Sequence, residues 1–234
     1  MKKVINCAHR GAMAYAPQNT IKAFKLAVEM GADMVELDAH RTADGIVIVN
    51  HDTRFNKTTP KAGKITGLKY CEVEKLKFEG QNIPKLEEVI QLCKESNIGI
   101  DIECKQGSAI EKVVDLVKKY DFIDQTLITQ FNPYVLKKSR SLEPAIETGF
   151  LTLPVLYPRK FKRASNIGAT AIVPNIKQVN KRFMKKAERN NLKVIVWTVN
   201  EENDMKKLID LGVDGIITNK PDLLAKIKSR MGVS

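Results

Sequence analysis

Short apolar runs alternate with longer amphipathic stretches along almost the whole chain. Apolar runs of about four to eight residues are typical of buried strands, whereas apolar positions three and four residues apart are typical of helices. On this pattern we expect strands at residues 4–8, 34–39, 46–50, 98–104, 125–130, 146–151, 171–174, 193–199 and 215–218. We expect helices at residues 20–30, 86–96, 108–120, 133–141, 158–166, 181–190, 202–211 and 221–230.

The order of these elements predicts an α/β fold. The strand at 46–50 follows its predecessor through a tight turn, so it must be antiparallel and lie outside a parallel barrel. Each of the eight other strands is linked to the next by a segment that contains a helix. Residues 1–234 are therefore expected to form one TIM (β/α)8 barrel domain, with a β-hairpin extension after strand 2 and a small insertion at about residues 53–83. A doubly wound open sheet is the alternative, but no glycine-rich phosphate turn follows the first strand.

A hairpin turn is expected at residues 44–45, because Asp-Gly is a preferred pair for a two-residue turn. Such a turn places Asp38 directly opposite His51 on one face of the ribbon. Glu36 shares that face, since side chains alternate along a strand. The turn thus predicts two carboxylates beside a histidine.

Polar residues gather where the expected strands end, which is the end of a TIM barrel that carries active sites. These residues are His9, Arg10, Glu36, Asp38, Glu103, Lys105, Gln130, Trp197 and Asn200. His51 returns to the same level on the hairpin. We therefore expect a functional site at this rim.

Three carboxylates at the rim, on Glu36, Asp38 and Glu103, are hard oxygen ligands. Without a cysteine or histidine cluster beside them, they favour Mg²⁺ or Ca²⁺ over zinc. The alternative is that they only pair with Arg10 or Lys105. Convergence of all three on one site favours the metal.

Two histidines, His9 and His51, flank the carboxylates and suit a general base and a general acid, although a histidine at a strand end can also be structural. His40 is expected to point away from the site. Arg10 and Lys105 add positive charge that suits an anionic phosphate ester. A Schiff-base role for Lys105 fits less well beside two histidines and three carboxylates.

Two aromatic residues, Phe131 and Trp197, follow strands at the same rim. They either cap the barrel or form an apolar wall against the carbon skeleton of a small substrate.

The charge of the chain is +12 and is unevenly spread. Residues 157–193 contain eleven Lys or Arg and a single acid, Glu188. This segment is either a solvated lysine-rich face or a peripheral contact with an anionic membrane. It lacks interleaved aromatics and groove-reading motifs, so no nucleic-acid partner is expected.

Targeting signals are not expected. The basic residues 1–6 precede only a short apolar run, unlike a signal peptide. No apolar run reaches the roughly 18 residues of a membrane span. The four cysteines have no paired metal spacing. We expect a cytoplasmic protein.

Eight stretches spread over nearly the whole chain carry a specific combination of motifs. They are AHRG (8–11), PQNT (17–20), VELDAHRTADG (35–45), NHD (50–52), IECK (102–105), QFNP (130–133), WTVN (197–200) and GVDGIITNKPD (212–222). Together they resemble the glycerophosphodiester phosphodiesterase family.

The resemblance implies a TIM barrel that catalyses metal-dependent hydrolysis of glycerophosphodiesters to sn-glycerol 3-phosphate and an alcohol. It also implies residue roles: His9 and His51 as the acid/base pair, Glu36, Asp38 and Glu103 on the divalent cation, and Arg10 and Lys105 on the phosphate. The implied first step is attack of the glycerol 2-hydroxyl on phosphorus, with His9 as base and His51 as acid. Water then opens the resulting cyclic phosphate.

Two other functions stay open from the sequence. One is a lysophospholipase D docked on an anionic membrane through residues 157–193, and the other is a non-catalytic phosphate-binding barrel. The motif PQNT also departs from the family's usual PENT, with Gln18 in place of glutamate. If the family's glutamate helps to bind the metal or to fix Arg10, its replacement would shift the metal affinity or the pH optimum, and we do not expect activity to be lost.

Overall fold

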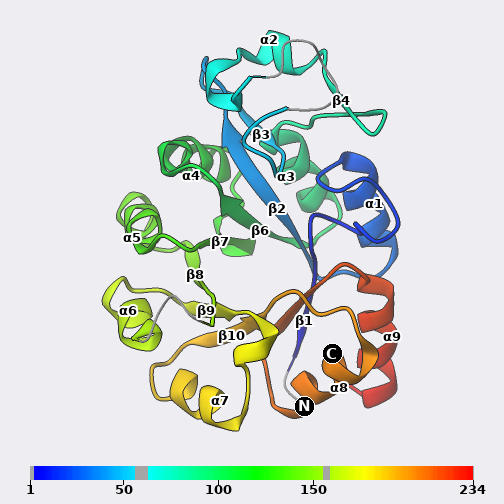
Figure 1. The fold of residues 1–234 in the computed structure, drawn as a ribbon, viewed down its shortest axis with the longest axis vertical. Helices are drawn as coiled ribbons and strands as arrows, with labels where there is room; N and C mark the ends of the chain where they lie inside the picture. The colour runs from blue at the N-terminus through cyan, green and yellow to red at the C-terminus, as the bar shows by residue number, and fades with distance from the viewer. Residues whose placement is uncertain (1–2, 56–62, 155–158, 234) are drawn as a thin grey trace.

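The protein is a closed barrel of eight parallel strands, and a computed structural model describes residues 3–55, 63–154 and 159–233 (Figure 1). The barrel strands are β1 (Ile5–Ala8), β2 (Met34–Arg41), β6 (Gly99–Cys104), β7 (Thr126–Gln130), β8 (Glu147–Thr152), β9 (Ala171–Pro174), β10 (Lys193–Val196) and β11 (Gly215–Thr218). Each strand pairs with the next in chain order, and β11 pairs with β1 to close the barrel. The predicted TIM barrel is confirmed.

A ring of helices surrounds the barrel, with one or more in each connection (Figure 1). These are α1 (Ile21–Glu29), α3 (Leu86–Glu95), α4 (Ile110–Lys119), α5 (Pro133–Leu142), α6 (Lys160–Asn166), α7 (Lys181–Glu188), α8 (Glu202–Asp210) and α9 (Pro221–Met231). Short 3-10 turns precede or join them at η2 (Gly107–Ala109), η3 (Ile123–Gln125) and η4 (Ile176–Gln178). Their bounds agree with the predicted helices to within two residues. The start of the expected helix at 158 lies outside the described residues.

Local sequence explains where several helices begin. The side chains of Thr20, Asn132 and Asn180 each accept a hydrogen bond from a backbone N–H in the first turn of the helix that follows. Proline occupies the first position of α5 and α9, where no backbone donor is needed.

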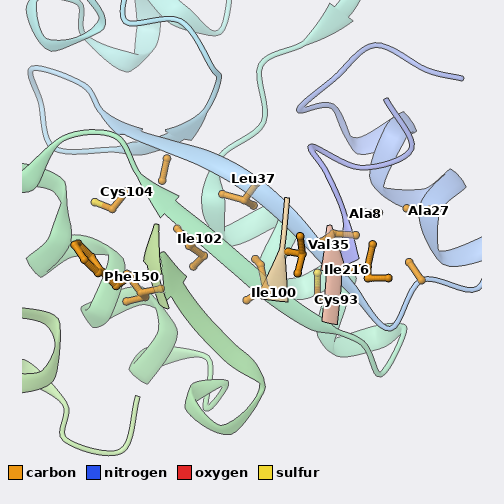
Figure 2. Close-up of a cluster of buried hydrophobic side chains, with 14 of the residues drawn as sticks. Ala8, Ala27, Val35, Leu37, Cys93, Ile100, Ile102, Cys104, Phe150 and Ile216 are labelled. Carbon is orange, nitrogen blue, oxygen red and sulfur yellow. The ribbon is translucent and has the colours of Figure 1, made fainter. Parts of the chain in front are cut away.

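The alternation of strand residues separates the two faces of the barrel wall. Val35 and Leu37 of β2, with Ile100 and Ile102 of β6, lie in the apolar layer between barrel and helices (Figure 2). Residues between them in the sequence therefore face the barrel interior. This alternation directs the acidic residues of β2 and β6 inward.

The described part of the insertion after the hairpin has more secondary structure than its polar, lysine-rich sequence indicates. It contains η1 (Ile65–Gly67), α2 (Tyr70–Val73) and a small hairpin of β4 (Lys77–Phe78) and β5 (Gln81–Asn82). A separate apolar cluster of Ile48, Phe55, Ile65, Val73 and Ile83 holds it against the β2–β3 ribbon. It lies beyond β3 at the top of Figure 1.

The register predicted for the hairpin is wrong by one residue. Strand β3 (Val47–Val49) pairs Val49 with Ala39, so the residue that follows, Asn50, lies opposite Asp38. The Asn50 N–H indeed donates to the Asp38 carbonyl at 2.9 Å. His51 is therefore not the cross-strand partner of Asp38.

The cause of the shift is a three-residue loop at 43–45. The N–H of Thr42 donates to the Ile46 carbonyl at 2.9 Å, and the N–H of Gly45 donates to the Thr42 carbonyl at 3.1 Å. Gly45 has φ +90°, as expected for a type I turn that ends in a bulge with glycine. Asp-Gly thus occupies the second and third positions of a longer loop.

Gly11→Ala is expected to destabilise the protein much more than Gly45→Ala. Both glycines have positive φ, +78° and +90°, where an added Cβ costs about 1 kcal/mol or more. A Cβ on Gly11 would also lie 2.7 Å from the carbonyl carbon of Ala23, whereas nothing lies within 4 Å of one on Gly45. We expect losses of about 1 kcal/mol for Gly45→Ala and about 3 kcal/mol for Gly11→Ala in urea unfolding. Equal losses would contradict this packing.

Candidate active site

A cleft with a volume of about 190 Å³ opens at the carboxyl ends of the barrel strands. Its lining contains eight of the residues predicted from the sequence: His9, Arg10, Glu36, His51, Glu103, Lys105, Phe131 and Trp197. The ninth, Asp38, is fully buried next to them. The volume is below the roughly 300–1,000 Å³ of drug-sized ligand sites, so the enclosed part suits a small polar group.

Three carboxylates converge at one side of the cleft. Glu36 and Asp38 come from β2, and Glu103 comes from the neighbouring strand β6, directly beside Asp38 in the register. Each offers an oxygen, and the three oxygens lie within 4.8 Å of one another. Three hard oxygen donors at this spacing fit a divalent cation such as Mg²⁺ or Ca²⁺.

The electrostatics of the cluster favour the same ion. Burial, then the negative charges of Asp38 and Asp101, raise the pKa of Glu36 well above its usual range. Burial also raises the pKa of Glu103, in spite of the nearby Lys105 ammonium. The carboxylates thus lack full compensation from the protein, and a bound divalent cation would supply the missing positive charge.

Two cations compensate one carboxylate, Asp38. Arg10 Nε lies 3.1 Å from Asp38 Oδ2, and Lys105 Nζ lies 3.0 Å from Asp38 Oδ1 and 3.0 Å from Glu103 Oε1. Burial acts to raise the pKa of Asp38, but Lys105 and Arg10 hold it below its usual value. Burial likewise opposes the charge of Lys105, yet Asp38 and Glu103 raise its pKa. Because Lys105 stays protonated, it is unsuited to form a Schiff base.

Gln18 contacts the site through Arg10. The Arg10 Nη1 donates to Gln18 Oε1 at 2.6 Å. Gln18 thus helps to hold the guanidinium without neutralising its charge.

His9 is oriented as a proton acceptor. Its Nδ1 lies 2.7 Å from Asn219 Oδ1, and an amide oxygen can only accept, so Nδ1 carries the proton. The other nitrogen, Nε2, lies 3.9 Å from Glu36 Oε2 at the edge of the cleft. Burial, then the Arg10 charge, lower the pKa of His9 to about 4. Near neutral pH the ring therefore has a free lone pair on Nε2.

His51 reaches the cleft from a bend after β3, not from the strand itself. Its side chain is 38% exposed, and its Nδ1 lies 2.9 Å from Asp52 Oδ1. The bend is held by Asn50, whose side-chain amide donates to the Asp52 carbonyl at 2.8 Å. The residue predicted from the sequence is in the site, although the predicted cross-strand pairing is not what places it there.

The opposite side of the cleft is apolar. The rings of Phe131 and Trp197 meet edge to face, with centroids 5.7 Å apart and planes at 78°. Trp197 Nε1 donates to the Val173 carbonyl at 2.9 Å, which fixes the indole. Leu151 and Ile217 continue this wall. The cleft thus has one charged and one apolar side.

Sequence reasoning missed three residues of the site. Asn219 directly follows β11, so the rule applied to the other strand ends would have found it. Asp101 faces the interior two residues before Glu103, and burial raises its pKa to about 8. Asn19 lies on a loop, where no strand pattern points to it, and its side chain donates to Asp38 Oδ2 at 2.8 Å.

The prediction that His40 points away from the site is also wrong. His40 is two residues after Asp38 and therefore shares its face of β2. It is fully buried beside the site, where it contacts Gln106 and the backbone of His51. The other two predicted rim residues, Gln130 and Asn200, both form hydrogen bonds at the rim. The side-chain amide of Gln130 donates to the Cys104 carbonyl, and the side chain of Asn200 accepts from the backbone N–H of Asn219.

The fold and the site define a TIM-barrel protein with two histidines and a carboxylate cluster at one rim. The chain belongs to the glycerophosphoryl diester phosphodiesterase family, whose profile matches residues 9–223. It is 33% identical over 243 residues to a glycerophosphodiester phosphodiesterase of Caldanaerobacter subterraneus subsp. tengcongensis, covering 98% of this chain and 100% of the relative.

Two further comparisons bear on substrate and fold. A lysophospholipase D of Rattus norvegicus is 29% identical over 273 residues, covering 96% of this chain and 86% of the relative. The structure of an Oleispira antarctica phosphodiesterase in complex with the product sn-glycerol-3-phosphate has the same fold, with a TM-score of 0.87 at 23% identity over 98% of this chain and 97% of that one.

Divalent-cation affinity is expected to keep rising with pH above the range in which ordinary carboxylates ionise. Metal binding needs ionised carboxylates. Because the pKa values of Glu36 and Glu103 are raised, protons compete with the metal ion for these two carboxylates at higher pH than they would at ordinary carboxylates. Calorimetric titration of Mg²⁺ and Ca²⁺ in buffers of different ionisation enthalpy measures both the affinity and the protons released.

The matched variants are Glu103→Gln in the cluster and Glu95→Gln on the exposed end of α3. Glu103→Gln should weaken binding by at least about tenfold and release fewer protons, since one ligand and one titrating group are gone. Glu95→Gln should bind like the unmodified protein. An affinity that is independent of pH would contradict the charge balance described for the cluster.

Proposed function

We propose that the protein hydrolyses glycerophosphodiesters to sn-glycerol 3-phosphate and an alcohol, with a divalent cation, Mg²⁺ or Ca²⁺, held by Glu36, Asp38 and Glu103. The observation that carries this proposal is the convergence of three carboxylates, two histidines and two cations on one small cleft. The relative from Caldanaerobacter, named for this activity, supports it over its full length. The Oleispira phosphodiesterase was seen with the corresponding product.

The charged side of the cleft suits the phosphodiester group. Arg10 and Lys105 both have donors there and stay positively charged beside Asp38. Such fixed cations stabilise negative charge that grows on the phosphoryl oxygens in the transition state. The divalent ion, when bound, would polarise the phosphoryl group as a Lewis acid.

His9 acts as the general base in the first step. The glycerol 2-hydroxyl oxygen forms a bond to phosphorus, and its proton passes to the free Nε2 of His9. Asn219 holds the ring in the tautomer that leaves this nitrogen unprotonated. A neutral ring near neutral pH is what the lowered pKa of His9 provides.

His51 acts as the general acid in the same step. As the bond between phosphorus and the departing alcohol breaks, His51 gives its proton to the alcohol oxygen. The Asp52 carboxylate beside Nδ1 balances the charge of the ring while it carries that proton. In the second step water opens the cyclic phosphate, and the two histidines exchange roles. The apolar wall of Phe131 and Trp197 lies against the carbon atoms of the glycerol.

Activity is expected to disappear with chelator and with either histidine removed. His9→Ala and His51→Ala should each lower kcat by about 10²- to 10⁴-fold, the usual contribution of a positioned acid or base. EDTA should abolish turnover, and added Mg²⁺ or Ca²⁺ should restore it. The measurement is release of sn-glycerol 3-phosphate from choline, ethanolamine, inositol and glycerol diesters.

Glu95→Gln is the control variant and should keep the activity of the unmodified chain. Circular dichroism shows whether each histidine variant is folded. Retained activity in EDTA, or in either histidine variant, would refute this mechanism. Binding without turnover on every diester would instead support a non-catalytic phosphate-binding barrel.

A second candidate function is lysophospholipase D activity at an anionic membrane. The observation in its favour is that residues 159–193, which include α6, η4 and α7, carry eleven Lys or Arg and one acid. The lysophospholipase D of Rattus norvegicus supports the substrate class. In the described part of the chain, no helix has the length and apolar content needed to span a bilayer. Contact through these Lys and Arg side chains would be peripheral and electrostatic.

Vesicles that contain about 30% phosphatidylserine should bind the protein, and neutral phosphatidylcholine vesicles should not. The double variant Lys185→Glu, Lys186→Glu on α7 should weaken vesicle binding by at least about tenfold, since each basic residue near such a surface contributes about 1 kcal/mol. Lys75→Glu in the insertion is the matched control. Activity confined to deacylated diesters, or equal binding to both vesicles, would exclude this function.

A further inference from the structure

The acid/base residue His51 lies outside regular secondary structure. Strand β3 ends at Val49, two residues earlier, whereas His9 directly follows β1 and the three carboxylates lie on β2 and β6. A side chain on a bend needs contacts other than strand pairing to hold it in a reactive position. One of these contacts comes from His40.

The ring of His40 joins two backbone segments of the site. Its Nε2 lies 3.4 Å from the carbonyl oxygen of His51, and its Nδ1 lies 3.0 Å from Nε2 of Gln106. The backbone N–H of Arg41 donates to Gln106 Oε1, so the amide nitrogen of Gln106 faces His40. That nitrogen can only donate, so His40 Nδ1 accepts and the ring proton is on Nε2. His40 therefore donates to the His51 carbonyl.

Burial favours this arrangement. His40 is fully buried, where polar groups need hydrogen-bond partners, and each of its two ring nitrogens has one. Gln106 lies just after β6, the strand that carries Glu103, and its own carbonyl accepts from Cys104 Sγ at 3.1 Å. The contact chain thus ties the bend of His51 to the strand that carries a proposed metal ligand.

We propose that His40, held by Gln106, is a positioning residue for His51. It fixes the His51 carbonyl and so holds the neighbouring imidazole toward the cleft. It does not touch the substrate and does not transfer a proton. This inference rests on the proposed function in one respect, the role of His51 as the acid for the departing alcohol.

The test compares His40→Met with His40→Gln. Both side chains are similar in length, but only glutamine keeps a donor that can reach the His51 carbonyl. His40→Met should lower kcat toward glycerophosphocholine about 10- to 100-fold, as expected when a catalytic group is misplaced by about 1 Å. His40→Gln should stay within about fivefold of the unmodified chain. KM and Mg²⁺ affinity should stay unchanged in both.

The leaving group provides a readout that general structural damage would not change. The p-nitrophenyl ester of glycerol phosphate loses a phenolate that needs no proton, so its cleavage depends little on an acid. In single-turnover assays, His40→Met should slow release of p-nitrophenol less than about threefold. Gln106→Leu removes the amide that donates to His40 Nδ1. It should lower kcat with the same selectivity between the two substrates, but by a smaller factor.

A double variant tests whether His40 acts through His51. Residues that work as a unit are not additive, so adding His40→Met to His51→Ala should change the remaining activity by less than about twofold. If His40→Met lowered the activity of the His51→Ala variant by the same factor as that of the unmodified chain, the inference would be overturned. Equal effects of His40→Met and His40→Gln on the unmodified chain would overturn it as well. If His51→Ala itself were fully active, the proposed function would fail instead, so the two failures are distinguishable.

Discussion

The buried carboxylate cluster is the constraint on which the rest of the site depends. Strand alternation directs Glu36, Asp38 and Glu103 into the barrel, where their charges are removed from water and repel one another. Arg10 and Lys105 compensate mainly Asp38, and Asn19 donates to the same carboxylate. The pKa of Glu36 nevertheless remains raised. A site built with this deficit of positive charge is suited to capture a divalent cation, which supports the proposed cofactor.

The same alternation also divides the cleft into two chemical halves. The charged residues lie on or directly after β1, β2 and β6. The apolar side comes from residues on or after the strands opposite, namely Phe131, Leu151, Trp197 and Ile217. A phosphate ester of glycerol has the matching division, with an anionic group next to a short carbon chain. The two halves of the cleft therefore suit such a substrate in one orientation, which supports the proposed substrate class.

How much the sequence predicted depended on whether a feature was local. The barrel and the ends of its strands follow from the spacing of apolar residues along the chain. The positions of Glu36 and Glu103 in the site could therefore be predicted from their own strands. The hairpin register was not, because Asp-Gly fits both a two-residue and a three-residue loop. The longer loop is held by tertiary contacts, including the Ala43 N–H on the Leu68 carbonyl of the insertion. His51 was thus assigned to the site on a pairing that does not exist.

The two histidines differ in their surroundings in a way that matches the opposite roles proposed for them. His9 is paired through Nδ1 with an uncharged amide, Asn219, and burial lowers its pKa, so it is kept as a free base. His51 is more exposed and is paired through Nδ1 with the carboxylate of Asp52, which balances a charged ring. Environments that separate two similar groups are how one site provides both base and acid at the same pH. This difference favours His9 as the base in the first step, because reversing the roles would require the buried ring beside Arg10 to be protonated already before the reaction starts.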